Sequence, residues 1–334
     1  MRILLAIIVI AAAGWSGYWF WGQRAVETGL TEWFEIREDA GWMVDYTDIE
    51  TTGFPNRFDT TITDLELTDP KTGLGWTTPF LQIFALSYKP HHIIAIWPHT
   101  QSLFTPYQTL TVTSTDMRGS LVFVPGPALA LDRTTIDLET LGLVSTLGWQ
   151  MSADTAQLSL RRTPAVATDS YDIAFDAREM MLPQRIGASS GDLEMGDQLA
   201  TLRLRATTVF DAPWDRHAIE ERRPQPSQIR IDEARVVWGS IGLRITGDMV
   251  VDADGQPTGA LTIRAENWRD ILRLAIATGA LPPQIEPLLD RGLGMIARPS
   301  DNGETIDVKL DMSGGRFLLG GLIPLGPTPV LRLR

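Results

Sequence analysis

The pattern of hydrophobic and polar positions divides the chain into two unequal parts. Residues 3–21 form an apolar run without charge, preceded by Arg2 and followed by Gln23 and Arg24. Because an α-helix rises about 1.5 Å per residue, a run of this length covers the hydrocarbon core of a bilayer. The rest of the chain contains no second run of this kind. We therefore predict a transmembrane anchor over residues 1–22 that tethers a large body.

Aromatic residues gather at the far end of this run, where amphipathic rings favour the level of the lipid headgroups. They are Trp15, Tyr18, Trp19, Phe20 and Trp21. Arg2 and the α-amine stand on the short side of the run. By the positive-inside tendency these charges stay in the cytoplasm, although Arg24 on the other side weakens that signal. The expected orientation therefore places the body outside the cytoplasm.

A cleavable signal peptide is the alternative interpretation of the same stretch. Ala11, Ala12 and Ala13 offer a small-residue cleavage site after a short apolar core. Cleavage there would leave a mature chain that starts with Gly-Trp-Ser-Gly-Tyr-Trp-Phe-Trp, which is unusually apolar for a soluble terminus. Because the site also lies inside the apolar run rather than after it, the sequence favours an uncleaved anchor.

A juxtamembrane helix is predicted over residues 23–40. Its apolar residues recur three or four positions apart, which places them on one helical face. These residues are Val26, Leu30, Trp33 and Phe34. We expect Gly41 to end the helix, since glycine commonly follows a helix C-terminus.

From Gly41 onward, apolar and polar residues alternate in short segments. This period of two is typical of an antiparallel sheet that is covered on one side. The clearest segments contain Leu110/Val112, Leu158/Leu160, Tyr171/Ile173/Phe175, Leu202/Leu204, Leu261/Ile263 and Ile306/Val308/Leu310/Met312. Turn signals separate them at Asp69-Pro70, Pro125-Gly126-Pro127, Asp254-Gly255 and Asn302-Gly303. The predicted fold is mainly β: a long curved antiparallel sheet that forms a groove or an elongated sandwich.

A small helical insertion is predicted near the C-terminus. Asn267 can cap a first helix whose apolar stripe ends at Gly279, and two prolines separate it from a second helix. The stripe of the first helix is Trp268, Ile271, Leu272, Ala275 and Ile276, and that of the second is Ile285, Leu288, Leu289, Leu293 and Ile296. Two strands are expected to follow, at 304–312 and about 328–333. The body over residues 41–334 has one candidate boundary, the charged and proline-rich loop 211–228.

Composition disfavours some classes of function. The formal net charge is −12, with 41 acidic against 29 basic residues. This disfavours nucleic acid as a partner, because phosphate binding needs concentrated Lys and Arg. Cysteine is absent, which excludes disulfides and thiolate metal sites. At 44% hydrophobic residues the chain can form a sizeable folded core.

No catalytic motif has the structural context that it needs. Residues Gly187–Gly191 match G-x-S-x-G, but the flanking residues do not suggest a buried strand before Ser189 or an apolar helix after it. The residues Asp252–Gly255 resemble the start of a calcium loop, but later ligand positions carry Pro257 and Gly259, so a hairpin turn is expected. We predict no enzyme activity and no cofactor.

Histidines are the remaining candidates for a metal site. Three of the four lie close in sequence, at His91, His92 and His99. Adjacent residues of a strand point to opposite faces, so at most two of these three rings can converge. A structural role is therefore expected, and no metal site is predicted.

Apolar strand positions are the other functional candidates. In one interpretation they form an ordinary core, and in the other some of them line a groove for acyl chains. The candidates for such a lipid groove are Ile62, Leu65, Leu110, Val112, Ile173, Phe175, Leu202 and Leu204. The anchor favours the second interpretation, because an exported body held at a membrane can collect apolar ligands there.

Several stretches together resemble a known family over nearly the whole chain. They are the anchor, Gly53-Phe54-Pro55-Asn56-Arg57-Phe58 with the strand to Leu67, the segments 76–80, 85–90 and 96–101, and the Asp252–Gly259 hairpin with its helix. This pattern resembles the alphaproteobacterial family called domain of unknown function 2125. More distantly it is similar to AsmA-like proteins, which are anchored in the inner membrane and carry a curved β groove implicated in moving phospholipid.

The resemblance implies a single-pass inner-membrane protein with its N-terminus in the cytoplasm and its body in the periplasm. The expected function is to bind or transfer lipid, or another apolar envelope component, through a β groove. The alternative is a structural or assembly factor of the cell envelope that acts by protein–protein contacts, through the loop 211–228 or an exposed sheet edge.

Overall fold

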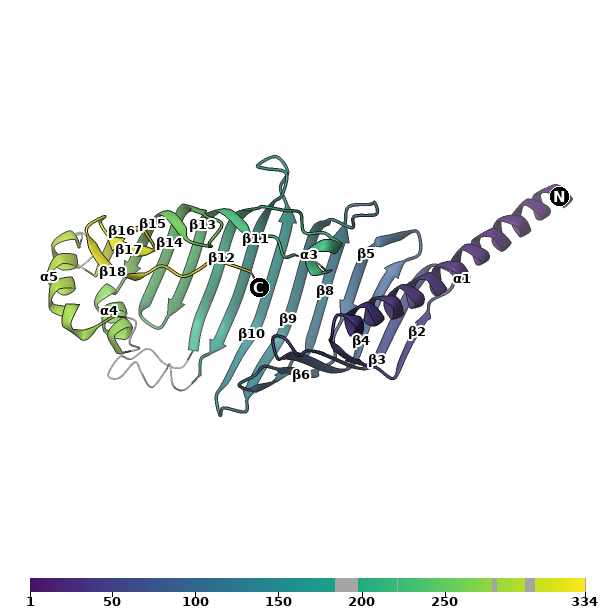
Figure 1. Ribbon diagram of the computed structural model, residues 1–334, viewed down its shortest axis with the longest axis horizontal. Helices are drawn as coiled ribbons and strands as arrows, with labels where there is room; N and C mark the ends of the chain where they lie inside the picture. The colour runs from purple at the N-terminus through teal and green to yellow at the C-terminus, as the bar shows by residue number, and fades with distance from the viewer. Residues whose placement is uncertain (184–197, 221, 278–280, 298–303, 334) are drawn as a thin grey trace. The chain divides into compact units, whose positions relative to one another are not determined.

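The computed structural model describes every residue except 184–197, 221, 278–280, 298–303 and 334. In the described part, 18 strands form one antiparallel sheet, with a long N-terminal helix and small helices near the C-terminus (Figure 1). This arrangement confirms the mainly β fold. The chain divides into a first unit, Met1–Pro125 with Ile136–Gly148, and a second unit, Gly126–Thr135 with Trp149–Arg334.

The first unit contains the long helix and the first strands of the sheet. Its elements are α1 (Arg2–Asp39), β1 (Met43–Asp45), β2 (Asp48–Thr52), β3 (Arg57–Asp69), β4 (Leu74–Leu86), β5 (Lys89–Ile96), β6 (Thr100–Phe104), β7 (Thr109–Thr113), β8 (Asp116–Phe123) and most of β9 (Leu131–Ser145).

The second unit contains the start of β9 and the remaining strands and small helices. They are β10 (Gln150–Arg162), β11 (Ser170–Met181), β12 (Gln198–Phe210), α3 (Arg216–Glu220), β13 (Pro226–Trp238), β14 (Ile241–Val251), β15 (Pro257–Glu266), α4 (Trp268–Ala277), the 3₁₀ helix η1 (Pro283–Ile285), α5 (Glu286–Ile296), β16 (Thr305–Ser313), β17 (Arg316–Leu319) and β18 (Ile323–Pro327).

Helix α1 is continuous through both helices that the sequence predicts. It ends at Asp39, just before Gly41, as expected. The Gly41 N–H donates to Glu38 O at 2.8 Å, and the Trp42 N–H donates to Arg37 O at 3.0 Å. Gly41 has a φ of +92°, a conformation that suits glycine at this position of a Schellman motif.

The C-terminal half of α1 packs on the sheet of the first unit. Phe34 is buried in one cluster with Ile62 and Leu65, and Leu30 and Trp33 pack against that cluster. The predicted apolar face of this helix is thus confirmed. It closes a core at β3, because the helix covers the apolar side of that strand.

The two predicted helices near the C-terminus are also confirmed, as α4 and α5. They bury Trp268, Leu272 and Leu289 in one cluster with Ala265 of β15 and Ile306 of β16. Asn267 precedes α4 at a φ of +52°, and its backbone carbonyl accepts the Asp270 N–H at 2.9 Å. Its side-chain amide donates to Ser240 O instead of capping the helix.

The predicted strand at 328–333 is wrong, whereas that at 304–312 is confirmed as β16. The final segment binds the ends of several hairpins instead of a neighbouring strand. The N–H groups of Thr328 and Leu331 donate to Gly315 O and Gly255 O at 2.9 and 2.8 Å. Leu333 exchanges two hydrogen bonds with the side chain of Gln225, both at 2.9 Å. These loop contacts hold the tail without making it a strand of the sheet.

Candidate functional site: the apolar and charged faces of the second unit

The strands of the second unit place apolar and polar side chains on opposite faces. Register partners in an antiparallel pair project to the same face, and successive residues alternate. Phe175 pairs with Leu158 on one side and with Leu204 on the other. The register continues from Leu204 through Ala234 to Ile245. Apolar side chains of different strands therefore form rows across the sheet.

Two adjacent rows form what we call the apolar face. Its members are half-buried, and none belongs to a buried cluster of the described chain. They are Leu158, Leu160, Ile173, Phe175, Leu204, Ile231, Ile245, Leu261, Ile263 and Leu310. A continuous apolar surface across β10–β16 thus remains partly open to solvent.

Four of the eight groove candidates lie together on this side of the sheet. Ile173, Phe175 and Leu204 belong to the apolar face. Leu202 lies on the same side but packs against the cluster of Leu199, Trp238 and Ile241. The alternation of residues 158–160, 261–263 and 306–312 was a signal for further members. Ile231 also stands in a local alternation, Ile229-Arg230-Ile231-Asp232, which a register shift between Ile231 and Ala234 then interrupts.

The other four candidates lie in the first unit. Ile62 and Leu65 are 2% and 1% exposed beneath Phe34 of α1, so no ligand has access to them. Val112 is buried, and Leu110 is half-buried in register with Leu103. Ile62, Leu65 and Val112 are therefore core positions, the alternative that the sequence left open, whereas Leu110 is only half-buried.

The opposite side of the same strands is charged. Arg203, Arg235, Arg244 and Arg264 are register partners on β12–β15, and Asp176 and Asp307 stand at the two ends of this arginine row. Like charges directly opposite each other on a sheet are destabilising. Arg244 forms an ion pair with Glu233 at 3.2 Å, which offsets part of this repulsion. In the described chain, no ion pair is seen for Arg235 or Arg264, and both are exposed.

Asp176 holds two arginines of this charged face. Its carboxylate accepts from Arg203 at 2.8 Å and also from Arg205. Partial burial favours the neutral carboxyl, but these hydrogen bonds outweigh it, so the pKa of Asp176 lies below its ordinary value. The group is therefore ionised at neutral pH and neutralises one end of the arginine row.

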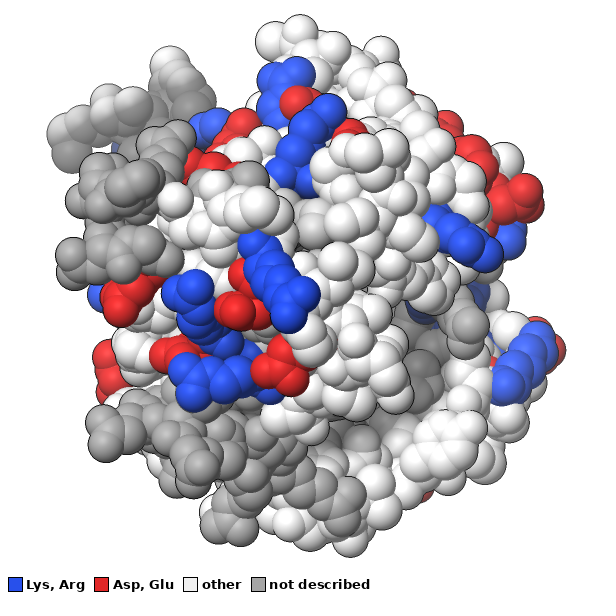
Figure 2. All heavy atoms as spheres, turned by 90° about the vertical axis from the view of Figure 1, so that its left-hand side faces the viewer, with Lys and Arg blue, Asp and Glu red and all other residues white. Residues whose placement is uncertain are grey.

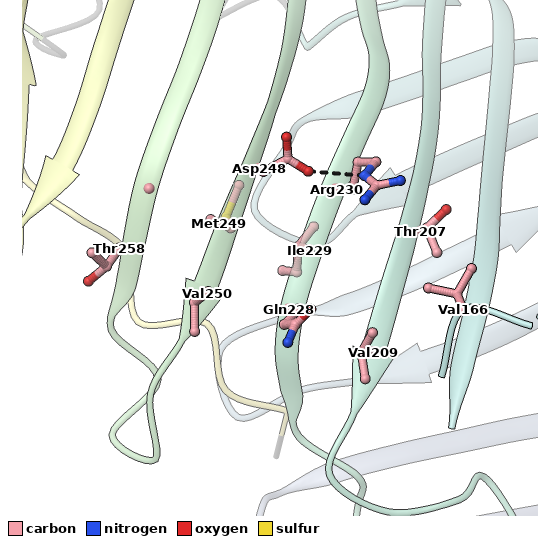
Figure 3. Close-up of a pocket in the computed structure, with 11 residues that line it drawn as sticks. Val166, Thr207, Val209, Gln228, Ile229, Arg230, Asp248, Met249, Val250 and Thr258 are labelled. Carbon is pink, nitrogen blue, oxygen red and sulfur yellow. Dashed lines mark hydrogen bonds and ion pairs between the residues drawn. The ribbon is translucent and has the colours of Figure 1, made fainter. Parts of the chain in front are cut away.

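Two hollows lie over the charged side of the second unit. The first has a volume of about 230 Å³ and contains the ion pair between Arg230 and Asp248, at 3.0 Å, as Figure 3 shows. Register partners Thr207, Arg230 and Asp248 come from three neighbouring strands. This volume is below the usual range for small-molecule sites, about 300–1,000 Å³.

The second hollow is larger, at about 470 Å³. Its lining combines the apolar residues Leu160 and Ile173 with five charged side chains: Arg133, Arg161, Asp172, Arg205 and Asp232. Arg161 and Asp172 form an ion pair at 2.9 Å. Each hollow thus contains an ion pair, and the larger one combines charged side chains with apolar residues.

The motifs considered for chemistry have structural roles where they are described. Asp252 Oδ1 accepts the N–H groups of Asp254 and Gln256 at 2.9 and 2.8 Å, which closes the expected β14–β15 turn. His92 Nε2 contacts Ser120 Oγ, and His99 Nδ1 contacts Ser114 O, both at 3.0 Å. No group of three potential metal ligands occurs among the described residues. The Gly187–Gly191 motif lies outside them.

Charge on the side of the molecule shown in Figure 2 is mixed. Acidic and basic side chains lie interspersed between wide uncharged areas on this side, where α4 and α5 are found. The net charge of −12 is therefore not gathered there into one acidic patch. The arginine row is the more ordered charge feature of the second unit.

Comparison with known proteins places the chain in a family. A family model described as "Uncharacterized protein conserved in bacteria (DUF2125)" matches residues 19–329. No curated protein and no solved structure matches the chain. Helix α1 is long and apolar enough to cross a membrane, and its position fits either a membrane anchor or a signal sequence. Since the match covers nearly the whole sequence, the chain belongs to the DUF2125 family.

Proposed function

We propose that this protein is held at the inner membrane by α1 and binds or transfers lipid, or another apolar envelope component, on the apolar face. In this proposal the N-terminus lies in the cytoplasm, the body lies in the periplasm, and the protein performs no covalent chemistry. The main observation that supports this proposal is the half-buried apolar surface on β10–β16, which no described helix or buried cluster covers. The resemblance to AsmA-like proteins points the same way.

The dimensions of the apolar face suit acyl chains. Seven strands about 4.8 Å apart give a width of about 29 Å across β10–β16. Burial of each methylene group stabilises a complex by about 0.8 kcal/mol, so a long acyl chain supplies ample binding free energy even when only part of it is covered. A lipid can therefore lie across the strands with its polar headgroup left in water.

Retention of the anchor is supported by the continuity of α1. The helix runs without a break from Arg2 through the candidate cleavage site at Ala11–Ala13 to Asp39. Its segment from Leu30 to Phe34 packs into the core of the first unit. An apolar helix that is part of the folded body has the form expected of an anchor.

A matched pair of substitutions tests lipid binding. Phe175→Glu places a charge on the apolar face, whereas Ala174→Glu places the same charge on the opposite face beside its register partner Arg205. We expect full-length protein extracted from membranes to lose bound lipid in the first variant and keep it in the second, as measured by mass spectrometry of lipid extracts. Equal lipid in both folded variants would contradict the proposal.

The arginine row supports a second candidate, a structural or assembly factor that binds an acidic protein segment. Exposed Arg235 and Arg264 offer charge without an ion-pair partner in the described chain. The two contact surfaces expected from the sequence, the loop 211–228 and a sheet edge, are less available for binding. Arg222 of the loop forms an ion pair with Asp211 at 2.6 Å. The edge strand β18 carries Pro324 and Pro327, which hinder the pairing of another strand. Loss of a crosslinked protein in Arg235→Glu/Arg264→Glu, with lipid retained, would favour this candidate.

A further inference from the structure

The last part of the apolar run does not stand free of the body. Three aromatic side chains of α1 donate hydrogen bonds to backbone carbonyls of two loops in the first unit. Trp15 Nε1 donates to Pro55 O at 3.0 Å, and Trp19 Nε1 donates to Arg57 O at 2.8 Å. Tyr18 OH donates to Ser87 O at 2.6 Å. The helix is therefore fixed to the body from Trp15 onward.

Ring packing makes this attachment close. Trp19 is 3% exposed and stacks on Phe58, with ring centroids 6.0 Å apart. Phe54 meets the edge of Trp19 at 5.4 Å and stacks on Phe20 at 5.8 Å. Gly22 lies against Phe58, where a Cβ would come within 2.5 Å of the ring. Such packing holds the helix and the loop as one piece.

Helix length then limits where the membrane surface can lie. Only the 12 residues from Ile3 to Gly14 precede the attachment, and at 1.5 Å per residue they extend about 18 Å. The hydrocarbon core of a bilayer is about 30 Å thick. Residues 3–21 together extend about 28 Å, which matches it. The span therefore has to include the segment that is attached to the loops.

The loops at the attachment carry side chains suited to this depth. Phe54 and Tyr88 are 52% and 57% exposed, although both are large aromatic residues. Arg57 and Lys89 beside them are also exposed. Aromatic rings favour the interface between hydrocarbon and headgroups, and long cationic side chains reach from there to anionic headgroups.

We propose that the loop Gly53–Arg57 and the turn Ser87–Lys89 form a seating surface that inserts at the boundary between the headgroups and the hydrocarbon of the bilayer. The partner is a lipid surface, and the proposal rests on the membrane anchorage proposed above. The helix rises about 9 Å from Trp15 to Trp21, so the loop that binds Trp15 reaches about this far inward. The first unit is thereby held at the membrane by its loops as well as by its anchor.

Site-specific labelling tests this surface, because the chain has no cysteine of its own. Full-length single-cysteine variants Phe54→Cys and Tyr88→Cys carry an environment-sensitive fluorophore after reconstitution into vesicles that contain nitroxide-labelled phospholipids. Val9→Cys, within the apolar run, is the control for the membrane interior. Tyr107→Cys is the aqueous control, since Tyr107 is 86% exposed in the turn between β6 and β7.

We expect the nitroxide lipids to quench positions 54 and 88 several-fold more than position 107, with position 9 quenched as well. Tyr88→Cys keeps the result interpretable if Phe54→Cys loosens the contact with Trp19. Quenching at position 9 with none at positions 54 and 88 would overturn the seating surface but leave the anchorage intact. Absence of quenching at position 9 would overturn the anchorage and the seating surface together.

Discussion

Two arginines of the charged face, Arg203 and Arg205, share the carboxylate of Asp176. Because these hydrogen bonds hold the folded-state pKa of Asp176 below the unfolded value, the interaction contributes stability above the unfolded pKa, near 3.8. That contribution is lost as pH falls through the folded-state pKa. The carboxylate thus couples the stability of the second unit to acid.

Asp176→Asn should lower the free energy of unfolding at pH 7 by up to about 1 kcal/mol, the range of partly exposed ion pairs. The difference from the unmodified chain should shrink as pH falls below about 3.8 and disappear below the folded-state pKa, where both proteins carry a neutral side chain. Denaturant unfolding at several pH values measures this. A difference that stays constant down to the acid limit would contradict the assigned role of the carboxylate.

Trp19 and Trp21 offer a matched pair on α1, at 3% and 69% exposed. Trp19→Ala should destabilise the first unit by about 3–5 kcal/mol, because it removes a buried ring and the hydrogen bond to Arg57 O. Trp21→Ala should change stability by less than about 0.5 kcal/mol. Denaturant unfolding in one detergent compares the two variants, and similar losses would argue against the attachment of α1 to the loops.

At the level of secondary-structure elements, repulsion within the arginine row destabilises β12–β15. Arg235 lies between Arg203 and Arg244, and no carboxylate of the described residues forms an ion pair with it. Arg235→Thr should raise the free energy of unfolding by about 0.2–1 kcal/mol, since it removes like-charge repulsion and introduces a residue that favours strands.

Salt and a control variant make this prediction specific. The gain from Arg235→Thr should decrease at high salt, because ions screen exposed charges. Arg230→Thr, which breaks the ion pair with Asp248, should give no gain. If Arg235→Thr stabilises the protein, the arginine serves a function other than stability. Destabilisation at low salt would contradict the repulsion.

Sequence patterning predicted most of these elements because their signals are local. A period of two marked the strands, a 3.6-residue period marked α1, α4 and α5, and Gly41 marked the helix end. The strand predicted at 328–333 was wrong because a short segment of this kind can also bind loops, as its hydrogen bonds to Gly315 and Gly255 show. The arginine row was not predicted, since the pairing register of neighbouring strands has no local signal in the sequence.

The candidate site was predictable only in part, for a related reason. Ile62 and Ile173 stand in similar alternating segments, yet one is 2% exposed and the other is half-buried. The difference arises from Phe34 of α1, which covers Ile62 from a distant part of the sequence. Patterning identifies the apolar side of a strand, but coverage by other elements decides whether that side is core or surface.

For the whole molecule, the proposals combine an apolar helix, a seating surface in the first unit and an open apolar face in the second. Each part uses apolar area that a soluble protein would normally bury. In these proposals, the membrane covers the exposed helix and loops, and a lipid ligand covers the apolar face. The central claim is that lipid contacts this face directly.

Photocrosslinking in living cells measures that contact most directly. A photoreactive benzoylphenylalanine replaces Phe175 on the apolar face or Ala174 on the charged face of the full-length chain, in cells with radiolabelled phospholipid. Light should attach label to the protein at position 175 and much less at position 174, because the two side chains point to opposite faces of β11. Equal labelling, or protein crosslinks alone at position 175, would contradict the claim.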